Sequence, residues 1–284
     1  MNLIAILIVM AIEFYFRWGS QYRSFQWFVT LQEKIEKQFS DKSFFESWGG
    51  VLLVLLAPVA ILWLIAGVIG SGSYNLGYFV ICIVTLFYSL GPQPLDKSLN
   101  SYFEAMERGD EQAAFLVLKE TTHLESVIES DDLVRNATRV IFVESLCRYF
   151  GVIFWFIFLG PYGALFYRLT HQYYCHCKDN DKDKHLNLVA NLIHWINWLP
   201  ARVTSFMFLL GGDFVNGFYR VKDYLTDINS SNRQVITETG VAAMGIDIGR
   251  SSESVSENQN ALALIERTII IYLVVSAVLT FIMW

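Results

Sequence analysis

The chain has 284 residues, a charged fraction of 17% and a mean hydropathy of +0.39. A soluble globular domain carries about a quarter charged residues, so this composition argues against a soluble enzyme or binding domain. The formal net charge is −6 and no Lys/Arg-rich run is present, which excludes an ordinary nucleic-acid binder.

The apolar residues are concentrated in blocks. A bilayer core is about 30 Å thick, so a helix that spans it needs about 20 mainly apolar residues. Four segments are predicted to span, namely 51–70, 74–90, 150–167 and 268–284. Segment 1–16 is also apolar, but it is short and contains Glu13. An ionisable group at depth is usually paired or functional, so Glu13 is expected near an interface or beside a partner.

Segment 192–212 mixes tryptophan, proline and arginine with an apolar run, which is typical of an interfacial or re-entrant helix. The stretch 17–49 reads as an amphipathic helix, 92–138 as acidic helices and 213–266 as loop with short helices. No β-period is evident. The predicted fold is an all-α polytopic integral membrane protein with four to five transmembrane or re-entrant helices and helical polar loops, forming a single domain over 1–284.

The orientation follows from the basic residues in the loops. The hairpin tip at 71–73 has no Lys or Arg, whereas the flanks 17–49 and 92–149 carry five and six. The positive-inside rule therefore places these flanks in the cytoplasm. With four spans, 168–267 would be extracytoplasmic, and this assignment changes if 192–212 crosses.

Three common nucleotide-binding or catalytic motifs are absent from the sequence. There is no GxxxxGK[ST] loop, GxSxG elbow or HExxH helix. A small cluster of potential metal ligands comprises His171, Cys175, His176, Cys177 and His185. A zinc site needs four convergent ligands, usually with CxxC-type spacing, whereas this cluster has CxC spacing and polar flanks. We expect no metal and no cofactor.

Five patches of sequence together carry a family resemblance. They are LGPQPL at 90–95, AMERGDEQAA at 105–114, RVIFVESL at 139–146, LGPYGALFYR at 159–168 and NWLPARVTSF at 197–206. They resemble the AmpE/CobD membrane family, and the pair GPxGAxxYR and WxPAR is the most specific part. One branch of this family makes adenosylcobinamide phosphate by joining an aminopropanol unit to a corrinoid carboxylate. Members of the AmpE branch are bacterial inner-membrane proteins associated with β-lactamase induction.

Departures from the synthase pattern favour the AmpE branch. The GDP…HPV signature is missing from 17–30, and no RDT motif occurs in 126–132. Arg148 and Phe150 stand where the synthases would have an amide or acid. An ATP-driven ligase needs carboxylates to hold metal against phosphate charge. The resemblance therefore implies a multi-pass inner-membrane regulatory protein linked to β-lactamase induction and cell-wall stress, with no catalytic residue assigned. An adenosylcobinamide-phosphate-synthase-like ligase is the alternative.

The partners expected are the lipid bilayer and an anionic small-molecule or cell-wall-derived ligand, with no nucleic acid. The candidate ligand-binding residues are Arg139, Glu144, Tyr167, Arg168, Trp198, Pro200, Arg202 and Asn232. Arg139 and Glu144 lie five residues apart, nearly on one helical face. Either they line a cavity with Arg148, or Glu144 lies at the cytoplasmic interface as a solvated, salt-bridged residue. Tyr167 and Arg168 have two interpretations. Tyr167 is an aromatic-belt anchor and Arg168 a snorkelling cation, or, as the family resemblance implies, both belong to a pocket for an anionic ligand.

The motif WxPAR suggests a local structure of its own. Pro200 favours a helix start, because proline is well tolerated in the first turn. Arg202 would then project from a helix N-terminus, where free N–H groups and the helix dipole attract anions. The alternative is an interfacial turn that binds lipid headgroups. Asn232 survives from the SPNAG motif of the synthases in the stretch at 230–249.

Overall fold

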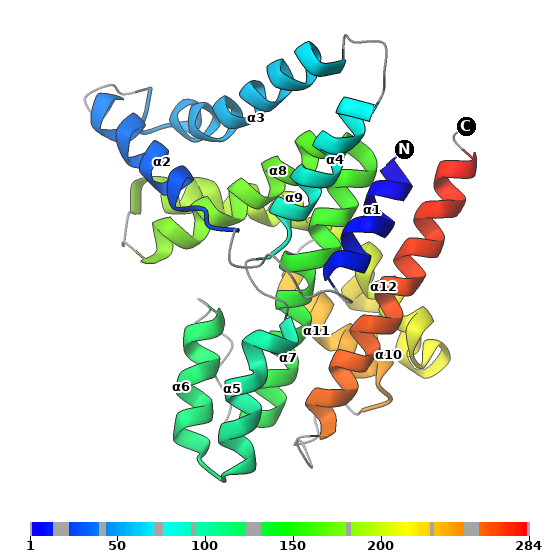
Figure 1. Ribbon diagram of the computed structural model, residues 1–284. Helices are drawn as coiled ribbons and strands as arrows, with labels where there is room; N and C mark the ends of the chain where they lie inside the picture. Colours follow the sequence, from blue (N-terminus) through cyan, green and yellow to red (C-terminus); the bar gives the residue numbers. More distant parts are fainter. Residues whose placement is uncertain are drawn as a thin grey trace. The chain divides into compact units, whose positions relative to one another are not determined.

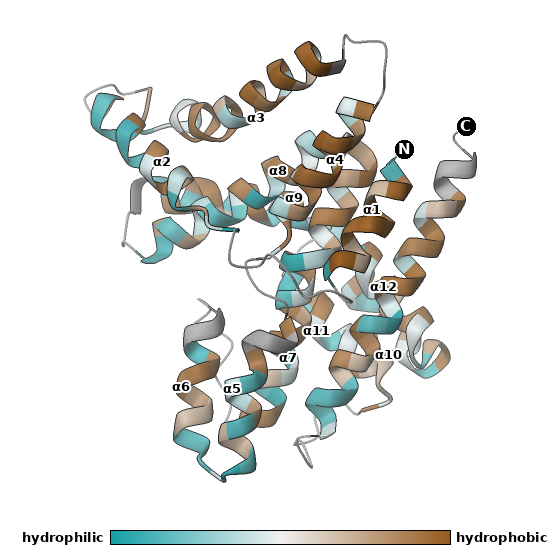
Figure 2. Ribbon diagram, in the orientation of Figure 1, coloured by the Kyte–Doolittle hydropathy of each residue, from teal (hydrophilic) through white to brown (hydrophobic). Residues whose placement is uncertain are grey.

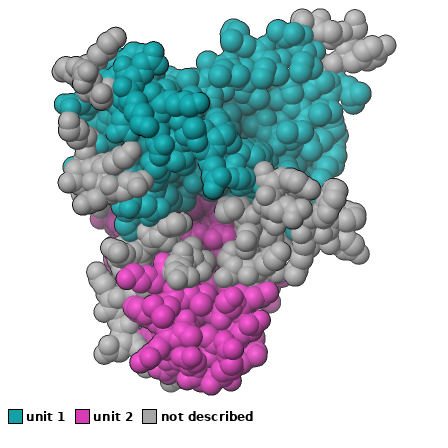
Figure 3. Space-filling model, turned by 60° about the vertical axis from the view of Figure 1, so that its left-hand side comes forward, with its two compact units in different colours: residues 1–92, 151–196 teal, residues 93–150, 197–284 magenta. Residues whose placement is uncertain are grey.

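The structure is a computed structural model, and it describes residues 2–13, 23–39, 44–70, 76–91, 95–122, 132–179, 183–227, 230–246 and 256–282. All regular elements in these ranges are helices, which confirms the all-α prediction (Figure 1). The chain divides into two compact units (Figure 3). Unit 1 comprises Met1–Pro92 and Gly151–Ile196, and unit 2 comprises Gln93–Phe150 and Asn197–Trp284. The single-domain organisation stays a prediction.

Unit 1 is built from apolar helices and one amphipathic helix. Its helices are α1 (Asn2–Ala11), α2 (Gln26–Phe39), α3 (Trp48–Gly70), α4 (Leu76–Ser89), α8 (Gly151–Asp179) and the first part of α9 (Asp183–Gly211). Figure 2 shows α3 as apolar along most of its length, whereas α2 has polar and apolar faces. Phe28 of α2, Leu55 of α3 and Tyr173 of α8 belong to one buried cluster. The predicted connector at 71–73 lies outside the described residues.

A buried ion pair joins Glu13, just after α1, to Arg23, just before α2. Arg23 donates to both carboxylate oxygens of Glu13, and its distance to Oε1 is 3.1 Å. It also donates to the carbonyl oxygen of Gly91 at 2.9 Å. Its guanidinium also lies 4.1 Å from the ring centroid of Phe87. Glu13 is buried. A buried carboxylate without a partner would be strongly unfavourable, and Arg23 supplies that partner. The position of Glu13 near a membrane interface stays a prediction.

Helix α8 is sharply bent. Gly160 has φ 64° and ψ −151°, a conformation that is essentially restricted to glycine. The part after the bend folds back along the part before it, since a Cβ on Gly151 would lie 2.3 Å from Oη of Tyr167. In a straight helix these residues would be about 24 Å apart. The predicted span over 150–167 is therefore interrupted at Gly160.

Three helical stretches are long and apolar enough to cross a membrane, judged by length and composition over the described residues. They are Trp48–Ile69, Leu133–Asp179 and Ser256–Val278. The large side chains of Trp63 and Leu64 in α3 are exposed in the isolated chain, as expected for a surface that faces lipid. α1 and α4 are shorter apolar helices. These features agree with the predicted membrane protein.

Unit 2 contains the remaining helices. They are α5 (Leu95–Glu107), α6 (Glu111–Thr122), α7 (Leu133–Ser145), a π-helical turn (Leu146–Phe150), the second part of α9, α10 (Phe214–Thr226), α11 (Asn232–Ala243) and α12 (Ser256–Ile282). α7 packs against α11 and α12, and α10 packs against α11. Asp132 caps α7 by accepting the backbone N–H of Arg135 at 2.9 Å. α7 therefore has a capped start and packs against two other helices of this unit.

The prediction that a helix begins at Pro200 is wrong, because α9 runs without interruption from Asp183 to Gly211. Proline has no N–H, so Pro200 cannot bond to the carbonyl of Ile196 four residues earlier. The indole Nε1 of Trp155 donates to that carbonyl oxygen at 3.2 Å, which satisfies the acceptor. Arg202 consequently projects from the interior of a helix, and the argument from a helix N-terminus does not apply to it.

Candidate functional site

Three of the predicted residues meet in unit 2. Trp198 and Arg202 are four residues apart on α9 and therefore share a face. The guanidinium carbon of Arg202 lies 4.3 Å from the ring centroid of Trp198, a cation–π contact. Arg202 Nη1 donates to Oδ1 of Asn232 at 3.1 Å and to the carbonyl of Trp198 at 3.1 Å. We call Trp198, Arg202 and Asn232 the α9–α11 cluster.

Local capping positions the α11 side of this cluster. The side chain of Ser231 accepts the backbone N–H of Gln234 at 3.1 Å and so makes Asn232 the first residue of the helix. Arg202 Nη2 donates to the carbonyl oxygen of Asp227 at 2.8 Å, just after the end of α10. One arginine therefore holds together α9, the end of α10 and the start of α11.

The cluster retains unused hydrogen-bonding capacity. Nε1 of Trp198 and Nε of Arg202 are buried, and neither atom has a hydrogen-bond partner among the residues that the structure describes. A buried donor without an acceptor costs about 1–3 kcal/mol, and an acceptor from a ligand would offset that cost for either atom. Burial lowers the pKa of Arg202 and Asp227 acts in the opposite direction. The guanidinium nevertheless stays charged at physiological pH.

Arg139 and Glu144 do not join that cluster, because each makes a different ion pair. Arg139 Nη2 lies 3.5 Å from Oε1 of Glu238 on α11. Arg148 Nε donates to Oε2 of Glu144 at 2.8 Å, one helical turn away. Burial raises the pKa of Glu238, while Arg139 and Arg135 act to lower it. Both side chains of the Glu144–Arg148 pair are buried, so Glu144 is not solvated. A role of this pair in ligand binding stays a prediction.

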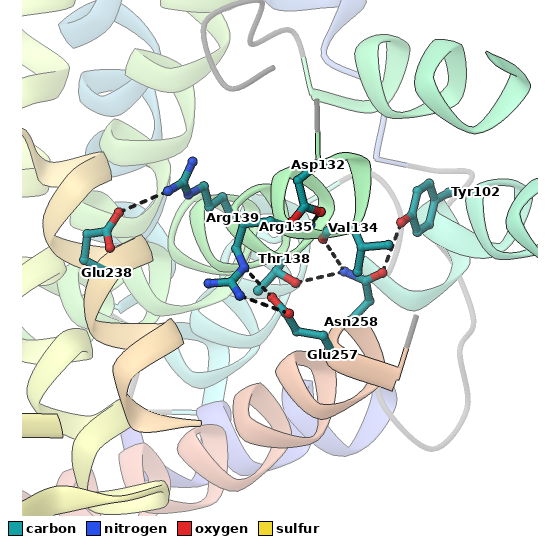
Figure 4. A network of polar contacts seen from close by, with 9 residues as sticks. All are labelled: Tyr102, Asp132, Val134, Arg135, Thr138, Arg139, Glu238, Glu257 and Asn258. Carbon is teal, nitrogen blue, oxygen red and sulfur yellow. Dashed lines mark hydrogen bonds and ion pairs between the residues drawn. The ribbon is translucent and has the colours of Figure 1, made fainter. Parts of the chain in front are cut away.

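A polar network that sequence reasoning missed connects α7 to α12 and α5 (Figure 4). Arg135 Nε lies 2.8 Å from Oε1 of Glu257, and both side chains are buried. Asn258 donates from Nδ2 to the carbonyl oxygen of Val134 at 2.8 Å and to Oγ1 of Thr138 at 2.9 Å. The network therefore fixes the first turn of α12 against α7.

Tyr102 of α5 completes this network. Its hydroxyl donates to Oδ1 of Asn258 at 3.0 Å. Burial, together with the negative charges of Asp132 and Glu257, raises the pKa of Tyr102, so the hydroxyl keeps its proton and remains a donor. The only sequence signal for these contacts was the polar character of α7 itself. Partners more than 100 residues away in the chain left no local pattern.

Tyr167 and Arg168, two further predicted residues, belong to unit 1. Tyr167 is fully buried beside Gly151. Arg168 is also buried, and its Nε donates to the carbonyl oxygen of Ser89 at 2.6 Å. These positions do not match an exposed aromatic belt with a snorkelling cation, because both side chains are enclosed within unit 1. Their role in binding a ligand stays a prediction.

The His/Cys cluster is also in unit 1. The ring of His185 lies between Oη of Tyr173, 2.8 Å from Nδ1, and the carbonyl oxygen of Phe45, 2.7 Å from Nε2. Sγ of Cys175 lies 3.7 Å from Nδ1 of His171. Among the described residues, no three His, Cys, Asp or Glu side chains are grouped as metal ligands. His185 thus has a structural environment made of neutral partners.

Comparisons with known proteins agree with the family resemblance. The chain matches the family described as regulatory signalling modulator protein AmpE over residues 1–283. A curated relative, the cobalamin biosynthesis protein CobD of Chromobacterium violaceum, is 23% identical over 177 residues, or 60% of this chain. The aligned region covers only 55% of that relative's length. No solved structure matches. Because the family match extends over nearly the whole chain, this protein belongs to the AmpE family.

Proposed function

We propose that this chain is a multi-pass regulatory protein of the bacterial inner membrane that binds an anionic, cell-wall-derived ligand through the α9–α11 cluster and thereby contributes to β-lactamase induction. Membership of a family of regulatory signalling modulators supports the regulatory role. The three long apolar helices support the membrane location. The ligand-binding role rests on the cluster itself.

The single observation that carries the ligand-binding role is the pair of unused donors on Trp198 and Arg202. Hydrogen bonds from a charged donor to an anionic acceptor are about twice as strong as neutral ones. Arg202 is already positioned by Asn232 and the Asp227 carbonyl, so little side-chain freedom is lost when an anion binds. A carboxylate or phosphate therefore fits these donors better than a neutral ligand does.

An induction assay tests this function. A strain that lacks the gene is complemented with the wild type, with Arg202→Ala or with Arg220→Ala, an arginine of α10 outside the cluster that serves as control. β-Lactamase activity is measured after exposure to a β-lactam, with membrane levels matched by immunoblot. We expect Arg202→Ala to behave like the deletion and Arg220→Ala like the wild type. Normal induction by Arg202→Ala would remove the cluster from the regulatory role.

The similarity to CobD supports a second candidate, an amide-forming ligase of the cobinamide-phosphate-synthase type. Arg148 weakens this candidate. It stands where the synthases would have an acid or amide, and it forms an ion pair with Glu144. Complementation of a cobinamide-synthase deletion is the test. Growth on cobyric acid plus aminopropanol phosphate would favour the ligase, whereas failure to grow, with the protein present in the membrane, is the result we expect.

A further inference from the structure

Helix α10 packs against α11 through one of its faces. Gly217 and Val221 are four residues apart on this face, and both are buried. A Cβ on Gly217 would lie 2.7 Å from Cδ2 of Leu209 on α9 and 3.4 Å from the carbonyl oxygen of Ala242 on α11. The packing is therefore close enough to need a glycine. The rest of the circumference of α10 is free to present other side chains.

The first exposed face of α10 is apolar. Phe214 and Phe218 are four residues apart, and so are Val215 and Tyr219, so the four side chains lie along one side of the helix. Val215 is 63% exposed and Tyr219 is 71% exposed. The rings of Phe214 and Phe218 stack with their centroids 5.8 Å apart, and Phe214 also meets the exposed ring of Phe206 on α9. We call Phe214, Val215, Phe218 and Tyr219 the apolar face of α10, and it continues onto α9.

The second exposed face of α10 is polar. Asn216, Arg220 and Asp223 are spaced by four and three residues, so they share one side of the helix, and all three are exposed. Neighbouring residues of a helix are about 100° apart around its axis, which separates Asn216 from Val215. An amphipathic helix with aromatic residues on one exposed face and polar residues on the other is typical of helices that lie in the surface of a bilayer.

Helix α12 indicates the depth at which α10 begins. On the exposed side of α12, the charged residues Glu266 and Arg267 are followed by the apolar Ile270, and the chain stays apolar from there. The boundary between the polar and apolar parts of this side therefore lies just after Arg267. α9 ends at Gly211, where a Cβ would lie 3.2 Å from Oγ1 of Thr268. α10 thus leaves α9 beside the boundary on α12.

We propose that α10 lies flat in the surface of the lipid bilayer, with its apolar face among the upper acyl chains and Asn216 on the side that faces water. A bilayer surface fits both exposed faces at once, because it is apolar below and aqueous above. It also fits the depth at which α10 begins, since α12 becomes apolar at the same level. This placement does not depend on whether the α9–α11 cluster binds an anion.

Spin labels on the full-length protein in phosphatidylcholine nanodiscs test the placement. Val215→Cys and Asn216→Cys are a matched pair, because both positions are exposed and adjacent but lie on different faces. Unsubstituted protein, taken through the same labelling, gives the background from the native cysteines. Power saturation measures how often each label collides with oxygen, which concentrates among acyl chains, and with a nickel chelate, which stays in water. We expect the oxygen-to-nickel ratio to be several times higher at Val215, and equal ratios or the reverse order would overturn the proposal.

A third label tests whether α10 lies flat. Lys222 is exposed and seven residues after Val215, so it is on the same side of the helix, about 10 Å further along the axis. The aliphatic stem of a lysine can lie along an apolar surface while its ammonium reaches water. In Lys222→Cys we expect the same oxygen-to-nickel ratio as in Val215→Cys. A ratio as low as that of Asn216→Cys would show that α10 leaves the bilayer.

The same measurements detect a protein on the apolar face. If a second copy of the chain covered it, the Val215 label would be shielded from both oxygen and the nickel chelate. Its spectrum would also show spin–spin broadening that disappears on dilution with unlabelled protein. Shielding from both reagents without broadening would show that another segment of the same chain covers the face. Either result would overturn the bilayer as the partner of α10.

Discussion

Arg202 of α9 donates a hydrogen bond to Oδ1 of Asn232, which is 30 residues further along the chain and begins α11. This contact joins two residues selected from separate sequence motifs. It directs one guanidinium nitrogen to an amide oxygen and leaves Nε without a partner among the described residues. The amide of Asn232 is neutral, so it orients the arginine without cancelling its charge.

Two substitutions at Asn232 distinguish orientation from charge. Asn232→Ala should weaken phosphate binding about threefold to tenfold, because Arg202 loses one orienting hydrogen bond. Asn232→Asp should weaken it further, because the new carboxylate forms an ion pair with Arg202 and competes with the anion. Titration of both variants with inorganic phosphate measures this order. The reverse order, with Asp binding phosphate better than Ala, would contradict the assigned role of Asn232.

The indole of Trp198 has two separable properties. Trp198→Phe keeps an aromatic ring for the contact with Arg202 and removes the Nε1 donor. We expect a loss of about tenfold in phosphate affinity with little change in thermal stability. Trp198→Leu should lose the cation–π contact as well, which costs about 0.5–1 kcal/mol at a partly exposed site. Equal phosphate affinity in wild type and Trp198→Phe would show that the indole N–H does not bind the anion.

The family, the helical fold and the three residues of the α9–α11 cluster could be identified from the sequence. Blocks of apolar residues predict helices in a membrane, since backbone groups in lipid must bond within their own segment. The WxPAR motif pointed to Trp198 and Arg202, and the remnant of a second motif pointed to Asn232. The prediction of a helix start at Pro200 failed, because the Trp155 indole supplies the donor that proline lacks.

The contacts between distant parts of the chain could not be predicted from the sequence. Arg135 and Glu257 are 122 residues apart, and a single sequence contains no periodic signal that pairs them. The same holds for Tyr102 and Asn258, which are 156 residues apart. The bend at Gly160 was also missed, because a glycine before a proline in an apolar helix reads equally well as a close-packing position.

The Arg135–Glu257 pair makes a prediction about stability. Glu257→Leu should reduce the free energy of unfolding by about 3–5 kcal/mol, because it leaves a buried guanidinium without its counter-ion. The double variant Arg135→Met with Glu257→Leu should recover most of that loss, since neither charge remains buried. Thermal unfolding in detergent at constant pH measures the cycle. Additive losses in the double variant would show that the two charges do not interact in the folded protein.

Glu238 makes a prediction about pH. Burial raises its pKa in the folded protein, so the folded state binds this proton more tightly than the unfolded chain does. The stabilising contribution is therefore full below the ordinary pKa of glutamate, about 4.3, and is lost as pH rises through the higher folded-state pKa. Glu238→Gln should remove this slope. Unfolding temperatures of both proteins over a pH series measure it, and parallel curves would contradict the prediction.

Native mass spectrometry of protein purified from its membrane tests most directly whether the α9–α11 cluster binds an anion. Wild type, Arg202→Ala and the control Arg220→Ala are released from detergent under identical conditions, and bound small molecules are recorded in negative-ion mode. The wild type and the control should retain the same anionic species, and Arg202→Ala should lack it. The same bound anion at equal occupancy in all three proteins would contradict the account.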